Sequence, residues 1–187
     1  MKHQIETERY FIAILPPEQI AAQAQALKEE AANQFATKGA LNSPPHLTLH
    51  MPFMWKIKKN ERLIDSISAF CREQNSFNIQ LKQLGCFEPR VIFIDVAENK
   101  QLVQLQSALK KWLKINLNIF NADYKERPYH PHLTIAFRDL KKAVFPAAWA
   151  YFKQKEFQED FKADALYLLK YQDKKWEVFK KFPLQEG

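Results

Sequence analysis

Residues 44–53, PPHLTLHMPF, and residues 130–139, HPHLTIAFRD, both contain Pro-His-Leu-Thr followed by an aliphatic residue. The chain has 187 residues and only five histidines, so chance is a poor explanation for two such matches. A motif repeated within a small protein indicates either an internal duplication or two sites that serve one task.

The residues around each copy predict the same order of elements: strand, helix, histidine strand, helix and strand. In the first copy RYFIAIL is a buried strand, Pro16 and Pro17 open a helix, and FNIQLKQLG alternates apolar and polar residues. In the second copy VIFIDV is a buried strand and Pro146 opens a shorter helix. The tail predicts a hairpin that turns near Asp173. The predicted ranges are 9–15, about 46–52 and 91–96 for strands, and about 98–115 for one long helix.

These patterns predict an α+β fold. We expect a bilobal duplicated fold with two mostly antiparallel sheets and an active-site cleft between them. Residues 1–187 would form a single domain of two pseudo-symmetric lobes, with approximate repeats at 9–88 and 89–187. No linker-like composition separates the two copies.

Strand geometry gives each motif a chemical face. Alternate side chains of a strand share a face, so each copy turns an imidazole and a hydroxyl to one side. Leu47, Leu49, Leu133 and Ile135 point the other way, into a core. If the lobes face each other, two His-Thr pairs converge on one cleft. The residues expected on this cleft are His46, Thr48 and His50 from the first copy, and His130, His132 and Thr134 from the second.

Two facing His-Thr pairs suit a phosphodiester. In-line displacement at phosphorus needs a base beside the entering oxygen and an acid beside the leaving oxygen, on opposite sides of the phosphorus. The ordinary histidine pKa of about 6.5 lets one imidazole be neutral and the other protonated near pH 7. Two threonine hydroxyls can donate to the non-bridging oxygens, where charge builds up. This chemistry requires no metal and no other cofactor.

The motifs His-Leu-Thr-Leu at 46–49 and His-Leu-Thr-Ile at 132–135 resemble the two HxTx motifs of the 2H phosphoesterase superfamily. Within it, the chain is similar to the 2′-5′ RNA ligase-like, 2′,3′-cyclic phosphodiesterase group. The resemblance implies a bilobal antiparallel fold and metal-independent hydrolase chemistry on cyclic or 2′-5′ phosphodiesters of RNA or nucleotides. It also implies that His46 and His132 are the acid–base pair and that Thr48 and Thr134 bind phosphate. It does not say which histidine is the acid, or whether the enzyme ligates or hydrolyses.

Other residues beside the motifs are candidates for substrate binding. His50 and His130 are in phase with the motif histidines, but each could instead be a solvated rim residue. Arg138 suits phosphate, yet an ion pair with Asp139 or Glu126 is an equal alternative. Tyr129, Phe53 and Trp55 flank the motifs and could either stack a base or pack at the cleft rim.

Two further interpretations stay open. His46, His50, His130 and His132 could supply four imidazoles to a metal, although threonine stands where an acidic or cysteine ligand would help. A non-catalytic RNA-binding protein could keep the same fold, and the net charge of +7 is compatible with it.

The composition bounds the remaining alternatives. The 15 Phe, 6 Tyr and 4 Trp support a large core, and the 3 Gly leave no glycine-rich phosphate loop. Cys71 and Cys86 have no metal spacing. The longest apolar run is too short to span a bilayer. We expect a cytoplasmic monomer whose partners are RNA or nucleotides rather than membranes.

Overall fold

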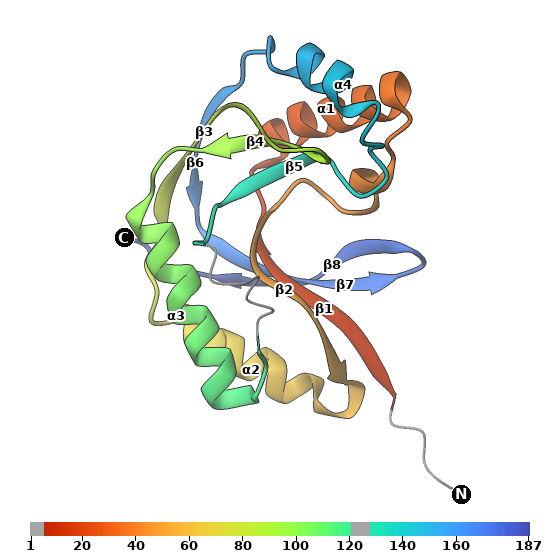
Figure 1. Cartoon of the computed structure of the whole chain (residues 1–187). Coiled ribbons are helices and arrows are strands. Elements are labelled where there is room, and N and C mark those ends of the chain that lie inside the picture. Colours follow the sequence, from red (N-terminus) through yellow and green to blue (C-terminus); the bar gives the residue numbers. More distant parts are fainter. Residues whose placement is uncertain (1–5, 121–127) are drawn as a thin grey trace, which may run out of the picture.

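The computed structural model describes residues 6–120 and 128–187, which form an antiparallel sheet with helices packed against it (Figure 1). The predicted α+β class is confirmed. The strands are β1 (Thr7–Ile14), β2 (Leu47–Lys56), β3 (Phe77–Phe87), β4 (Val91–Val96), β5 (His132–Ala136), β6 (Gln158–Ala163), β7 (Ala165–Gln172) and β8 (Lys175–Pro183). The helices are α1 (Glu18–Phe35), α2 (Asn60–Cys71), α3 (Lys100–Leu117) and α4 (Phe145–Phe152), with short 3-10 helices η1 (Gly39–Asn42) and η2 (Ile57–Lys59).

The element order repeats as the sequence predicts. β1-α1-β2-α2-β3 is followed by β4-α3-β5-α4-β6, and β7 and β8 form the predicted tail hairpin. The hairpin turns at Asp173 and Lys174, which both have positive φ, as a two-residue turn between twisted strands requires. The local sequence patterns therefore predicted the type and order of these elements.

The expectation of two separate sheets is wrong. The described strands form one eight-stranded sheet in the order β6-β3-β4-β5-β2-β1-β7-β8, and every pairing in it is antiparallel. β2 and β5 join its two halves at a single register pair, Leu47 with Leu133. The sequence repeat suggests one sheet for each copy. Hydrogen bonding at this single short junction nevertheless joins the two halves into one sheet.

Each half of the sheet takes strands from both halves of the sequence. β3 belongs to the first copy by sequence, but it pairs with β4 and β6 of the second copy. β7 and β8 come from the C-terminal end, but they extend the sheet beyond β1. The sequence order alone could not reveal this exchange, because strand pairing depends on distant partners.

The helices cross between the halves in the same way. α1 follows β1 in sequence but packs against β5, and α3 follows β4 but packs against β2. In Figure 1, α1 and α4 lie together at one end of the molecule, while α2 and α3 lie together at the other. This crossing ties both motif strands to helices from the opposite copy, so the site between them has support from both sides.

α3 shows how the sequence sets a helix and its buried face. Asn99 caps the start, because its side chain accepts a hydrogen bond of 2.9 Å from the Leu102 amide. Asn118 ends the helix in the left-handed conformation, at φ 57°. The buried leucines recur at helical spacing, as the sequence predicts. They are Leu102, Leu105, Leu109, Leu113 and Leu117.

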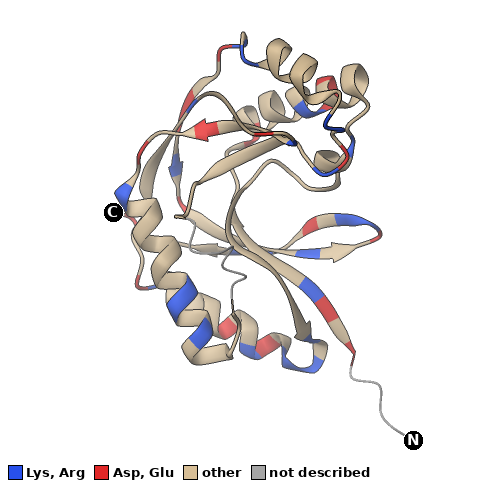
Figure 2. Ribbon diagram, viewed as in Figure 1, with Lys and Arg blue, Asp and Glu red and all other residues tan. Residues whose placement is uncertain are grey.

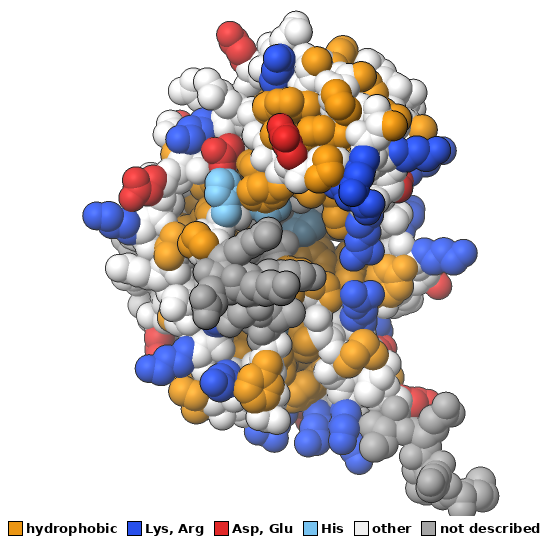
Figure 3. Space-filling model, in the orientation of Figure 1, with side chains coloured by type: hydrophobic (Ala, Val, Ile, Leu, Met, Phe, Trp, Pro, Cys, Tyr) orange, Lys and Arg blue, Asp and Glu red, His pale blue; other side chains and the backbone are white. Residues whose placement is uncertain are grey.

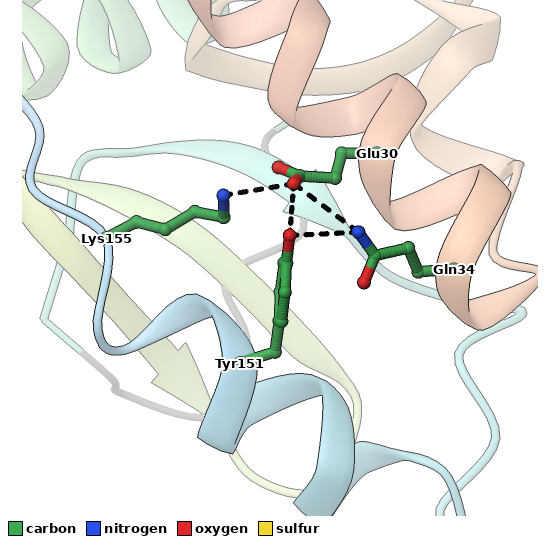
Figure 4. Close-up of polar contacts among 4 residues, drawn as sticks. All are labelled: Glu30, Gln34, Tyr151 and Lys155. Carbon is green, nitrogen blue, oxygen red and sulfur yellow. Dashed lines mark hydrogen bonds and ion pairs between the residues drawn. The ribbon is translucent and has the colours of Figure 1, made fainter.

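A polar cluster fixes α4 on α1 (Figure 4). The Glu30 carboxylate accepts hydrogen bonds from the Tyr151 hydroxyl and from the Lys155 ammonium, the latter at 3.0 Å. The Gln34 amide donates to the same Tyr151 hydroxyl at 2.9 Å. Partly exposed pairs of this kind contribute about 1 kcal/mol or less each, so the cluster orients α4 while Phe145, Ala148 and Phe152 bury its apolar face.

Candidate active site

Both sequence motifs open into one pocket of about 440 Å³. β2 begins directly after His46, and β5 begins at His132, beside the junction of the two sheet halves. His46, Thr48, His132 and Thr134 all lie on the pocket wall. The histidine side chains gather in one place on the face shown in Figure 3, bordered by hydrophobic side chains. The structure therefore brings together the four residues that the duplicated motif singles out.

The leucine face behaves as strand alternation predicts. Leu47, Leu133 and Ile135 have no exposed surface, and Leu49 is 2% exposed. These side chains belong to the main hydrophobic core and anchor both strands from behind. The motif side chains on the other face are consequently held by a packed sheet rather than by a loop.

The two imidazoles are held by the same local device. His46 Nδ1 donates to the Pro44 carbonyl at 2.7 Å, and His132 Nδ1 donates to the His130 carbonyl at 2.8 Å. A proline separates each histidine from its acceptor. Because a carbonyl can only accept, the Nδ1 atom carries hydrogen in both rings. Nε2 is then the atom that gains or loses a proton at each ring.

Burial lowers the pKa of His46 to about 4, although the Pro44 carbonyl acts in the opposite direction. The positive charge of Lys28 and the neighbouring His132 lower this pKa further. Burial also lowers the pKa of His132, against the opposing effect of the His130 carbonyl; the nearby His130 side chain lowers it and Asp95 raises it. Both imidazoles are therefore mainly neutral at pH 7 in the empty pocket, and an anionic phosphate would favour their protonated forms.

A β-bulge follows the threonine in each motif strand. In β2, Thr48 pairs with Ala13 and His50 pairs with Ile12, so Leu49 is an extra residue. In β5, Thr134 pairs with Phe93, while Ala136 pairs with Ile92, so the bulge lies at the equivalent place. Bulges are common beside active sites, where they redirect side chains. The two motif strands therefore share the same β-bulge as well as the same sequence motif.

This bulge corrects the expected placement of His50. Side-chain alternation changes phase at Leu49, so His50 turns into the core and is only 1% exposed. Its Nδ1 donates to the Met51 carbonyl at 2.9 Å, and its ring packs edge-on to Phe53. Met51 lies on the pocket wall instead of His50. A strict two-residue period could not predict the change of face.

His130 lies on the pocket rim, and its Nε2 is 3.0 Å from the Asp95 carboxylate. Its side chain is half exposed. Both open alternatives for His130 are thus present in the structure: it reaches the pocket, and water reaches it. Its contact with Asp95 is a feature that no local sequence pattern indicated.

Arg138 also lines the pocket, but strand phase does not place it there. β5 ends at Ala136, and Arg138 adopts a left-handed conformation with φ 63°. The Asp139 carboxylate accepts hydrogen bonds from Thr37 and from the amides of Lys38 and Gly39. Asp139 therefore holds the η1 loop beside the pocket. The other proposed ion partner of Arg138, Glu126, lies outside the described residues.

The three aromatic candidates have different positions. Tyr129 lies on the pocket wall, and its hydroxyl donates to the Thr48 carbonyl at 2.9 Å, which links the segment before β5 to β2. Burial raises the pKa of Tyr129. Phe53 packs against Tyr10 and His50, and Trp55 is buried with its Nε1 donating to the Lys59 carbonyl. Phe53 and Trp55 do not line this pocket, so they pack away from it rather than at its rim.

The sequence reasoning missed an aromatic wall on the β1 side of the pocket. The Phe11 ring lies 4.8 Å from the His46 ring and 4.6 Å from the Trp176 ring. Tyr171 contacts Trp176 at 5.1 Å, and the Arg9 guanidinium lies 5.5 Å from the Trp176 ring. Phe11, Tyr171 and Trp176 all line the pocket. Phe11 belongs to β1, which pairs with β2, and the pairing of the tail hairpin with β1 brings Tyr171 and Trp176 beside the first motif.

A second aromatic group lies around His132. The ring centres of Phe87 and Phe93 are 5.1 and 4.9 Å from that of His132. A Cβ atom at Gly85 would come within 2.5 Å of the Phe93 ring. Any residue other than glycine at this position would therefore displace the ring. An aromatic side chain of the pocket wall therefore lies next to each of the two motif histidines.

The basic side chains are spread over the surface rather than collected in the pocket. Figure 2 shows Lys and Arg on α3, around η2 and on the tail hairpin. Of the described Lys and Arg residues, Arg138 alone lines the pocket. The net charge of +7 can attract an anionic ligand to the molecule, but local recognition of phosphate depends on the motif residues and Arg138.

The described residues contain no group of three or more His, Cys, Asp or Glu side chains placed to hold one metal ion. The four-imidazole arrangement considered from the sequence does not form, because His50 faces the core. Within residues 6–120 and 128–187, none of the helices has the length and apolar character needed to cross a membrane.

Comparison with known proteins places this geometry in a family. Residues 16–175 match the family model described as the 2′-5′ RNA ligase superfamily. A Bacillus cytotoxicus protein named "Putative phosphoesterase" is 26% identical over 179 residues, which are 94% of this chain and 96% of that protein.

Solved structures agree on the fold. Escherichia coli LigT in complex with 3′-AMP has a TM-score of 0.73 at 21% identity and covers 97% of this chain and 100% of its own. TT0787 of Thermus thermophilus has a TM-score of 0.67 at 19% identity, with 95% and 98% coverage. Other crystal structures of E. coli LigT contain ATP or phosphate. The resemblance noted from the two HxTx motifs is confirmed, and this chain belongs to the 2′-5′ RNA ligase superfamily of 2H phosphoesterases.

Proposed function

We propose that this protein is a metal-independent phosphoesterase that acts on 2′,3′-cyclic or 2′-5′ phosphodiesters of RNA or nucleotides. The observation that carries the proposal is the convergence on one pocket of two His-Thr pairs whose histidines are held in the same way. The family supports phosphoester chemistry, and the LigT structures with 3′-AMP, ATP and phosphate are consistent with a nucleotide ligand.

The mechanism follows from the two Nε2 atoms. One imidazole takes the proton of the attacking oxygen, while the other gives a proton to the oxygen that leaves phosphorus. The threonine hydroxyls of Thr48 and Thr134 donate to the non-bridging oxygens, where negative charge increases in the transition state. Arg138 is a further cation on the pocket wall and suits a phosphate oxygen.

The walls of the pocket suit a nucleotide. Its volume of about 440 Å³ lies within the usual range for small-molecule sites. Trp176 and Tyr171 on one side, and Phe87 on the other, offer flat apolar surfaces to a base. A 2′-5′ phosphodiester has a nucleoside on each side of phosphorus, which matches a pocket with aromatic side chains beside both histidines.

A substrate screen tests the proposal. Purified protein is given a 2′,3′-cyclic nucleotide, a 2′-5′ dinucleotide and the matching 3′-5′ dinucleotide, each with and without EDTA, and products are separated by chromatography. We expect turnover of the cyclic or 2′-5′ substrate, unchanged by EDTA, and little cleavage of the 3′-5′ control. Tight binding without turnover would instead support a non-catalytic RNA-binding protein. Loss of turnover on chelation, restored by zinc, would contradict the metal-independent mechanism.

A further inference from the structure

The strands β2, β1, β7 and β8 are covered very differently on their two faces. The helices that pack most closely on them are α2 on β8 and α3 on β2, and both pack on the side of the main hydrophobic core. The other face buries a separate small cluster made of Phe11, Ala13 and Leu169. In Figure 1 the tip of the β7–β8 hairpin projects away from the helices. We call this second face of the four strands the open face.

The strand register arranges the open face in rows of side chains that cross the sheet. One row starts at the motif residue Thr48 and follows the register pairs Thr48–Ala13, Ala13–Tyr167 and Tyr167–Lys181. Since neighbouring strands lie about 4.8 Å apart, Lys181 is about 14 Å from Thr48 along this row. The row therefore begins at a residue of the candidate active site and leads away from it.

Two further rows lie beside the first. The middle row contains Phe11, Leu169 and Val178. In the outer row Met54 pairs with Arg9, and Tyr171 pairs with Trp176. Met54, Tyr171 and Val178 belong to the exposed large hydrophobic residues. The open face thus carries apolar and aromatic side chains that water can reach.

The first and outer rows each combine a cation with aromatic rings. Lys181 Nζ lies 5.8 Å from the centre of the Tyr167 ring. The Arg9 guanidinium lies 5.9 Å from the centre of the Tyr171 ring and 5.5 Å from that of Trp176. Single-stranded nucleic acid is bound by such groups, because aromatic rings stack on bases and cations attract phosphates.

The open face is continuous with the pocket. Phe11, Tyr171 and Trp176 belong to both, whereas Tyr167 and Lys181 lie beyond the pocket lining. A nucleotide whose phosphate reaches Thr48 therefore has the open face directly beside it. A chain attached to that nucleotide can extend over the face without crossing a helix.

The charges on these strands differ between the two faces. Glu8 and Glu177 lie beside Lys170 on the opposite face, since Lys170 forms an ion pair with Glu8 and pairs with Glu177 in the register. On the open face Lys181 forms a 3.5 Å ion pair with Asp164, and both side chains are more than half exposed. An exposed pair of this kind contributes little to stability, so a phosphate can compete with Asp164 for Lys181.

We infer that the open face binds the single-stranded RNA chain attached to the reacting nucleotide. The preferred substrate is then an oligonucleotide that ends in a 2′,3′-cyclic phosphate, rather than a free cyclic mononucleotide. The inference rests on the proposed function and names the substrate class of that site. The aromatic and cationic rows, and their continuity with the pocket, favour RNA over a protein as the occupant.

A series of substrates that differ only in chain length tests the inference. The series consists of adenosine 2′,3′-cyclic phosphate and oligoadenylates of two, three and four nucleotides that end in the same cyclic phosphate. Chromatography of the products gives kcat/KM for each. We expect kcat/KM to be at least about 10-fold higher for the tetranucleotide than for the mononucleotide, because added bases and phosphates contact the open face. Equal values at all lengths would overturn the inference and leave the proposed function standing.

Variants beyond the pocket lining locate the effect on the open face. Tyr167→Leu keeps an apolar side chain but removes the flat ring, and Lys181→Gln removes the charge. Both should leave turnover of the mononucleotide unchanged, and Tyr167→Leu should lower the advantage of the tetranucleotide by about 5-fold. An undiminished advantage in both variants would contradict the binding surface.

The neighbouring lysine is a matched control for charge. Lys180 pairs with Leu168, which belongs to the main core, so Lys180 lies on the opposite face from Lys181. Lys180→Gln removes the same charge one residue away and should keep the full advantage of the tetranucleotide. Equal losses in Lys180→Gln and Lys181→Gln would indicate a general effect of net charge and overturn the inference.

Salt dependence gives a second readout of the phosphate contacts. Each phosphate neutralised on a single strand adds about −0.7 to the slope of log kcat/KM against log salt concentration. The slope should be steeper for the tetranucleotide than for the mononucleotide in the wild-type protein. Combined Arg9→Gln and Lys181→Gln should bring the two slopes together. Slopes that differ as much in this double variant as in the wild type would exclude these cations as phosphate contacts.

Binding distinguishes failure of this inference from failure of the proposed function. A protein that hydrolyses none of the four lengths would overturn the proposed function. Fluorescence anisotropy of 5′-fluorescein tetra-adenylate then tests the open face alone. Weaker binding in Tyr167→Leu and Lys181→Gln, but not in Lys180→Gln, would support it, and unchanged binding would overturn it. A dimer that Tyr167→Leu dissociates, seen by light scattering, would show that a second copy covers this face and would also overturn it.

Discussion

The first motif strand, β2, and the second motif strand, β5, share a backbone design and differ in their surroundings. In each motif the histidine Nδ1 donates a hydrogen bond to the carbonyl two residues earlier, and a proline lies between the two residues. Each strand also has a β-bulge directly after the threonine. Asp95 of β4 pairs with His132 of β5, whereas the buried Lys28 binds the Ser43 carbonyl just before His46 and β2. Duplication thus supplies two equal groups, and the neighbours make them unequal.

That inequality has a chemical use. Displacement at phosphorus requires one group that accepts a proton and one that donates a proton. Two identical histidines would divide their time between productive and unproductive protonation states. The positive charge of Lys28 adds to the lowering of the pKa of His46, whereas His130 and Asp95 act in opposite directions on the pKa of His132, so the two rings differ in their surroundings. The comparison of β2 with β5 can therefore be tested by removing shared features first and differing features afterwards.

The largest effect is expected from the shared imidazoles. His46→Ala and His132→Ala should each lower turnover of a 2′,3′-cyclic nucleotide by at least about 10²-fold, because each removes one proton-transfer group. Steady-state kinetics measures the loss, and thermal melting near pH 7 should change little since both rings face the pocket. Full activity in either folded variant would show that the two motifs do not act as a pair.

The shared threonines come next. Thr48→Val and Thr134→Val should each lower kcat by about 10²-fold, the scale of losing one donor to a developing negative charge. Thr48→Ser and Thr134→Ser keep the hydroxyl and should retain most activity, so they are the matched controls. If the valine variants matched wild-type kcat, the hydroxyls would have no part in phosphate binding.

Removing aromatic side chains should affect kinetics differently on the side of the pocket near His46 and on the side near His132. Trp176→Ala should raise KM by about 10-fold with little change in kcat, because it removes a surface for stacking a base. Phe87→Ala should lower kcat as well, since its ring lies 5.1 Å from that of His132 and helps to hold it. Phe120→Ala, at an exposed position outside the pocket, is the control. Identical effects of the first two variants would remove this difference between the sides.

The smallest effect concerns stability against pH. The pKa of His46 is lowered to about 4 in the folded chain, while an unfolded histidine titrates near 6.5. Protons therefore bind the unfolded chain more readily, so the contribution of His46 to stability is present above about pH 6.5 and is lost as pH falls toward 4. Melting temperature should decline over this window, and His46→Gln should make the decline shallower. A parallel decline in both proteins would show that His46 is not the source.

Much of the site was predictable because its signals are local. The repeated His-x-Thr pattern, the strand period and the proline and turn residues depend on neighbours in sequence, and they predicted the element order, His46, Thr48, His132 and Thr134. The burial of Leu47, Leu49, Leu133 and Ile135 follows from the same period. A two-residue period carries no information about a bulge, so the turn of His50 into the core was missed.

By itself, the sequence determined the α+β class, the duplication, the four motif residues and the family to which they point. Only the tertiary structure decided that the strands form one sheet joined at Leu47 and Leu133, and that Phe11, Tyr171 and Trp176 border the pocket. It also decided which charge lies near which histidine. The physical reason is that hydrogen-bonded strand pairing and helix packing bring together residues far apart in the chain, and electrostatic influence depends on distance in space and not on separation in sequence.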